Sequence, residues 1–192
     1  MHNLSSRLLA AAAIAALGLQ ANLSRASEHE ATLATAAAPV PTVWQPHKAG
    51  FDYIGLTSTY TCDGLQSKVR QLLVYLGARK DLTVSATGCG PSDFPMGGVV
   101  RVDVEFQTLA VAPDTLATPG HGYWAPLRVA ARRPTFIENG DCELIDQIHH
   151  LVTDNFSLRN LDYDARCTPH DVSMDSFDVR GEVLRATPVG AG

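Results

Sequence analysis

The sequence lacks several features that mark particular classes of protein. Charged residues make up only 18% of its 192 residues, the formal net charge is −5, and no run of like charge exceeds two residues, as at Arg132–Arg133. A phosphate-binding surface needs a net basic face, so nucleic acid is excluded as a partner. The chain also contains no G-x-S-x-G motif and no glycine spacing typical of a P-loop or a dinucleotide site, and no cofactor is predicted.

Long hydrophobic runs are also missing. The longest continuous apolar stretch, Leu8–Leu19, has 12 residues and follows Arg7. It is too short to span a bilayer but has the length of a signal-peptide core. Small residues between Ala21 and Ala26 offer a cleavage site. The sequence therefore predicts that residues 1–26 are a signal peptide, that the protein is exported to the periplasm or outside the cell, and that its mature form has no membrane span.

Cysteine is scarce, and its spacing is wide. The four cysteines are nowhere closer than 25 positions along the chain, whereas redox-active pairs are usually close, as in Cys-x-x-Cys. An exported chain with an even number of cysteines is expected to carry structural disulfides instead.

What the sequence does contain is a pattern that occurs twice, over residues 60–89 and 140–167. Each copy has a cysteine followed by an acid, an amphipathic helical stretch, a strand-like run and a closing Cys-x-Pro. If each copy is a helix with an antiparallel return strand, its two cysteines meet at one end. We therefore predict the disulfides Cys62–Cys89 and Cys142–Cys167, each stabilising the fold by roughly 3–4 kcal/mol. Pairings between the copies remain an alternative.

Hydrophobic periodicity predicts two helices and six strands. Helical stripes run over residues 65–76 and 144–152. Strand patterns cover residues 51–57, 82–86, 100–106, 123–131, 159–166 and 177–186, with a connection over 109–121. The predicted class is α+β: two βαββ repeats forming a mainly antiparallel sheet with two helices on one face, a ferredoxin-like layout by analogy.

The predicted domain organisation follows from composition. Residues 27–47 are rich in Ala, Thr and Pro and are expected to be a flexible linker. Residues 48–187 are expected to form a single disulfide-stabilised domain of two repeats, at about 51–109 and 122–187, and residues 188–192 a tail.

Candidate chemical groups are dispersed. Metal binding is conceivable for His149 or His150 together with His170 and Asp171, although adjacent helical residues point about 100° apart. Acid–base chemistry could use carboxylate pairs on the strands: Asp162 with Asp164, Asp103 with Glu105, and Asp178 with Glu182. Such pairs usually only make the exposed face of a sheet polar and solvated. A binding surface could use the aromatic residues Tyr53, Tyr60, Tyr123, Trp124 and Tyr163, which are otherwise core or rim packing.

The sequence favours a binding or structural module of the bacterial envelope, with an envelope protein or a glycan as partner. One alternative is an envelope hydrolase that uses acids or His170 in the loops after Cys89 and Cys167. A second alternative is a metal-binding envelope protein.

Overall fold

The computed structural model describes residues 38–88, 98–116, 118, 120–171 and 173–187. Along the chain these residues form β1 (Val40–Ile54), α1 (Cys62–Tyr75), β2 (Thr83–Thr87), β3 (Val99–Val111), β4 (Gly120–Ala130), a 3-10 turn (Asn139–Asp141), α2 (Cys142–Asn155), β5 (Leu158–Arg166) and β6 (Ser176–Ala186).

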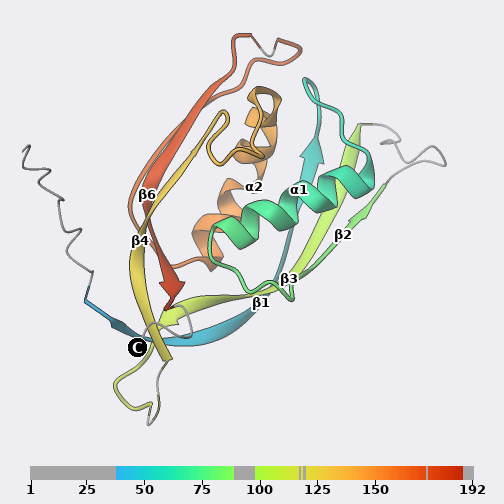
Figure 1. The fold of residues 1–192 in the computed structure, drawn as a ribbon. Helices are drawn as coiled ribbons and strands as arrows, with labels where there is room; N and C mark the ends of the chain where they lie inside the picture. The colour runs from blue at the N-terminus through green and yellow to red at the C-terminus, as the bar shows by residue number, and fades with distance from the viewer. Residues whose placement is uncertain (1–37, 89–97, 117, 119, 172, 188–192) are drawn as a thin grey trace, which may run out of the picture. The chain divides into compact units, whose positions relative to one another are not determined.

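The strands form one antiparallel sheet in the order β2-β3-β1-β4-β6-β5. The central strands β1 and β4 pair over only three positions, Val40–Thr42 with Gly120–Gly122. Because the two strands are antiparallel and overlap at their starts, they run in opposite directions away from this short seam. The sheet therefore has a first wing (β1, β2 and β3) and a second wing (β4, β5 and β6). Figure 1 shows that the sheet bends at the seam and that both helices lie between the wings.

The expected ferredoxin-like layout of two βαββ repeats is wrong, although the α+β class and the antiparallel pairing hold. The helices do not each cover their own half. In α1, the Tyr75 hydroxyl donates to the carbonyl of Arg128 on β4 (2.9 Å). In α2, the Gln147 side chain accepts from the N–H of Ile54 (2.6 Å) and donates to its carbonyl (2.9 Å), as a neighbouring strand would. Each helix thus contacts the opposite wing, and neither half is a separate unit.

The predicted linker boundary is also wrong, because β1 begins at Val40, inside residues 27–47. The proline content suggested a flexible segment, but Pro46 lies where β1 has a strand neighbour on one side only. Pro126 lies in the same situation on β4. A strand with one open side tolerates a residue that has no N–H to donate. The predicted connection over 109–121 is likewise shorter, since β3 continues to Val111 and β4 starts at Gly120.

The helices form where their apolar stripes predicted them. Thr61 caps α1 by accepting a hydrogen bond from the N–H of Gly64 (3.0 Å), and Gly77 beyond its end has a φ of 103°. The main core unites the buried stripes of both helices with inward side chains of both wings. Its central members are Leu65, Val69, Leu72, Leu73, Val100, Val102, Val104, Leu127, Val129, Leu144, Ile145 and Ile148.

Candidate functional site

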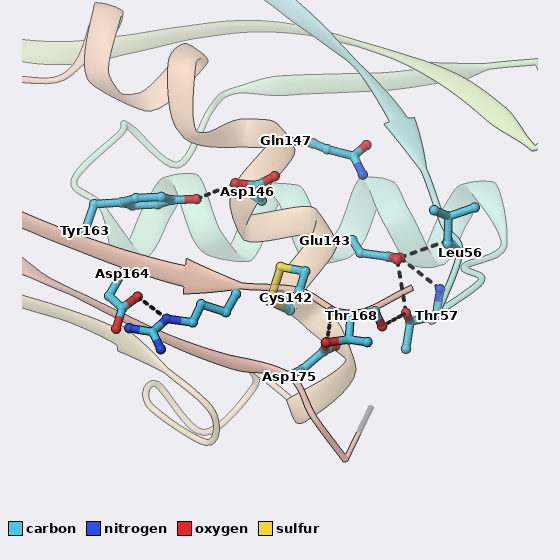
Figure 2. The surroundings of a disulfide bond; sticks show 12 residues. Leu56, Thr57, Cys142, Glu143, Asp146, Gln147, Tyr163, Asp164, Thr168 and Asp175 are labelled. Carbon is cyan, nitrogen blue, oxygen red and sulfur yellow. Dashed lines mark hydrogen bonds and ion pairs between the residues drawn. A yellow bond between two sulfur atoms is a disulfide. The ribbon is translucent and has the colours of Figure 1, made fainter. Parts of the chain in front are cut away.

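A disulfide joins Cys142 to Cys167, with their Cα atoms 5.6 Å apart. Cys142 is the first residue of α2, and Cys167 directly follows β5. The bond therefore fixes the start of the helix to the end of the edge strand (Figure 2). Cys62 is not a free thiol; its predicted partner, Cys89, lies outside the described residues.

Beside the disulfide, Glu143 is a buried carboxylate whose oxygens accept hydrogen bonds from the loop after β1. It accepts hydrogen bonds from the N–H groups of Leu56 (2.9 Å) and Thr57 (3.0 Å) and from the Thr57 hydroxyl (3.0 Å). The N–H of His170 donates in turn to the Thr57 hydroxyl oxygen (3.1 Å). Glu143 thus ties the loop after β1 to the start of α2 (Figure 2).

Asp141 is the most deeply buried carboxylate described, with 1% of its surface exposed. It occupies the N-cap position of α2, but its side chain makes no capping bond to that helix. It accepts instead from the Tyr60 hydroxyl, from Lys68 Nζ (3.0 Å) and from the N–H of Glu138 (2.8 Å). Asp141 therefore connects α1 to the turn that precedes α2.

The histidines proposed for metal binding do not assemble. His170 and Asp171 are exposed on the loop after Cys167, where Asp171 accepts from the N–H and hydroxyl of Ser173. These bonds lower the pKa of Asp171. His149 faces Tyr163 across a ring distance of 4.0 Å, and His150 is exposed. Across the described residues, no three metal-ligating side chains lie close enough together to hold an ion.

The paired carboxylates on the strands are engaged with cations on the outer sheet face. Arg101 binds Asp103, Lys48 binds Glu105, and Arg166 binds Asp164. Glu182 receives two bonds from Arg159 (2.8 and 2.9 Å). Hydrogen bonds from Arg180 and Arg128 hold the pKa of Asp178 well below its usual range. A general acid needs the opposite shift, so Asp178 does not fit that role.

The aromatic residues proposed for a binding face point mostly inward. Tyr53 has 1% of its surface exposed and donates to the carbonyl of Ser58, and the Tyr60 hydroxyl binds Asp141. Arg159 lies over the Trp124 ring, 4.5 Å from its centre. Tyr163 reaches from β5 to Asp146 on α2 (2.8 Å; Figure 2). Of the five, we therefore assign only Tyr163 to a candidate site.

That site is a groove between α2 and β5, which opens into an apolar cavity of about 40 Å³. Both helices and all three strands of the second wing line the cavity, almost wholly with apolar side chains. Polar groups stand at the rim: the Tyr163 hydroxyl bound to Asp146, the His149 ring, and the Thr153 hydroxyl, which donates to the His149 carbonyl (3.1 Å). We refer to this feature as the α2–β5 groove.

A β-bulge shapes the groove. The pairing of β5 with β6 shifts register between Arg159 and Asp162, where Asn160 has a φ of 53°. The extra residue lets Leu161 line the cavity. Gly181 lies opposite the bulge in a tight space, since an added Cβ would lie 3.1 Å from the Arg159 carbonyl oxygen and 3.3 Å from the Leu161 Cα. The sequence pattern predicted β5 as a regular strand, so it missed the bulge and the role of Leu161. The one available signal was Asn160, because asparagine tolerates positive φ.

Comparisons with protein-family models, curated proteins and solved structures find no match for this chain. None of the helices among the described residues is long and apolar enough to cross a membrane.

Proposed function

We propose that this protein is an exported binding module of the bacterial envelope and that the α2–β5 groove is its binding site. The observation that carries the proposal is the position of the Cys142–Cys167 disulfide. It fastens together the two elements that border the apolar cavity. An apolar wall with a few polar groups at its rim is the usual lining of a ligand site, and a volume of about 40 Å³ fits one small apolar group.

The disulfide relates the proposed groove to the proposed export of the protein. Such bonds form and persist in oxidising environments, including the periplasm and the cell exterior. Export would therefore supply the bond that holds α2 against β5, and a preorganised groove loses less conformational entropy when it binds. N-terminal sequencing of the protein from culture fractions tests this part. We expect a mature chain that starts within residues 22–27, and a full-length cytosolic chain would contradict export.

The chemistry of the groove favours a small apolar group with a polar attachment. The cavity wall offers almost no hydrogen-bonding partner, so an ionic or strongly polar group would lose its hydration without compensation there. The rim, in contrast, presents His149, Thr153 and Tyr163 to a polar neighbour of the buried group.

The disulfide variant Cys142→Ser/Cys167→Ser tests the role of the bond. Loss of the 25-residue link is expected to lower the free energy of unfolding by about 3–4 kcal/mol, measured by urea titration. Isobutanol, titrated in ¹H–¹⁵N NMR spectra, serves as the apolar probe. We expect it to shift amide signals of α2 and β5 in the oxidised protein and to do so more weakly in the variant.

A second variant separates an effect on binding at the groove from an effect on folding stability. Thr153→Leu is expected to fill the mouth of the cavity and abolish the isobutanol shifts while leaving the free energy of unfolding within about 0.5 kcal/mol, as for surface changes. Shifts that persist in this variant, or that map to the first wing, would show that the groove is not the site.

A further inference from the structure

Resting on the proposed function, we propose that the ligand of the α2–β5 groove is an extended, basic segment of a partner protein. The segment adds a strand to the free edge of β5 and places one apolar side chain in the cavity. This mode of recognition combines main-chain hydrogen bonds at a sheet edge with a pocket for alternate side chains.

The outer edge of β5 can pair with an added strand over several consecutive residues. β5 ends the sheet, and among the described strands it pairs only with β6. Its register with β6 is regular from Asp162 to Arg166, beyond the bulge. An edge strand presents a row of N–H and carbonyl groups to an incoming chain. The bulge marks the end of the regular edge and is the point where Leu161 reaches the cavity.

The other edge strand does not offer the same combination. β2 has five residues, and its inward side chain Val84 is 5% exposed within the core. Leu161 of β5, in contrast, is 36% exposed while it also lines the cavity. An apolar side chain of an added strand therefore finds a partly open pocket beside β5.

The size and charge of the groove define the partner. A cavity of about 40 Å³ suits the end of a Val, Leu, Ile or Met side chain better than an aromatic ring. Exposed carboxylates border α2 and β5, whereas Arg159 and Arg166 are already bound to Glu182 and Asp164. The exposed carboxylates that are not paired with either arginine are Asp146, Asp154 and Asp162. This acidic surround favours Lys or Arg on either side of the apolar residue.

Phage-displayed nonapeptides selected on the disulfide-bonded protein test the proposal. We expect enrichment of sequences with one aliphatic residue flanked by Lys or Arg. The affinity of the Leu161→Asp variant for a synthetic peptide of that sequence should be about tenfold or more below that of the wild-type protein, because the charge removes the apolar contact. The matched variant Ser85→Asp carries the same charge on the other edge strand, β2, and should bind the peptide with wild-type affinity. Equal binding by both variants would overturn the proposal.

N-methylated peptides test the strand pairing itself. Methyl groups on alternate residues block the N–H groups on one edge of an extended peptide. Of the two complementary methylated forms, one should lose about tenfold or more in affinity and the other should bind like the parent. If both bind equally, no strand is added and the proposal fails.

Two further outcomes separate this inference from the proposed function. If no peptide is enriched but isobutanol still shifts the α2 and β5 signals, the peptide inference is wrong and the apolar site stands. If neither binds, both are wrong. Sedimentation that shows a dimer dissociated by Leu161→Asp would overturn the inference as well, because a second copy of the chain would then occupy the edge.

Discussion

Replacing Asp141 by alanine is expected to lower the free energy of unfolding by about 3–5 kcal/mol, as for other broken buried ion pairs. The substitution removes the carboxylate that pairs with Lys68, whose side chain is 14% exposed. It also leaves the Tyr60 hydroxyl and the N–H of Glu138 without their acceptor. The ammonium group would be left close to the core, with the Phe136 carbonyl (2.7 Å) and the Tyr60 ring (6.0 Å to its centre) as neighbours but no counter-charge.

Urea unfolding followed by circular dichroism measures this effect. Asp154→Ala is the matched control, since Asp154 lies exposed on α2, and it should change stability by less than about 0.5 kcal/mol. Asp141→Asn should fall between the two, because an amide oxygen still accepts hydrogen bonds. If Asp141→Ala were no more destabilising than the control, the ion pair would not connect α1 and α2 as described.

The protein is also expected to unfold cooperatively in alkali, above about pH 10. Burial is the main cause that raises the pKa of Tyr53, Tyr60 and Tyr163 far above the usual value near 10. Nearby carboxylates add to the shift: Glu143 for Tyr53, Asp141 for Tyr60 and Asp146 for Tyr163. The folded state therefore keeps these phenols neutral at a pH where the unfolded state ionises them.

The sign follows from proton linkage. A group whose pKa is raised by folding contributes stability that is complete below its unfolded pKa and is lost as the pH rises through its folded pKa. Tyr53 and Tyr60 each remove up to about 1.4 kcal/mol per pH unit above pH 10, and the more exposed Tyr163 removes less because solvent screens it. The tyrosinate absorbance that Tyr53 and Tyr60 contribute should appear together with the loss of the helical circular-dichroism signal. Tyr60→Phe should make the pH dependence of stability less steep. Ionisation of all five tyrosines near pH 10 with the helices intact would contradict the burial of the Tyr53 and Tyr60 hydroxyls.

The helices could be predicted from the sequence because their determinants are local. The spacing of Leu65, Val69 and Leu72 defines one face of α1, and the glycine at position 77 ends it. Ile145 and Ile148 do the same for α2. Strand alternation in Val100, Val102 and Val104 was equally clear, because one face of β3 is buried and the other is charged.

The bent sheet and the groove could not be predicted, because they depend on contacts distant in sequence. Nothing local to Val40 indicates that it pairs with Gly122, and a proline-rich stretch ordinarily indicates a linker. The role of Gln147 depends on Ile54, 93 positions away. Aspartate is a common N-cap, but Lys68 of α1 and Tyr60, which precedes that helix, bind the Asp141 carboxylate instead. The bulge at Asn160 depends on the space that Gly181 leaves on the next strand.

The three-pair seam gives α2 a protective role during folding. Past the seam, β1 and β4 each have one side that pairs with no described strand. Gln147 and Glu143 of α2 bind the end of β1 and the loop that follows it. A chain that has formed its strands before α2 docks would leave two open borders at its centre, where strands of other molecules can pair. Early docking of this helix therefore protects the nascent protein from self-association.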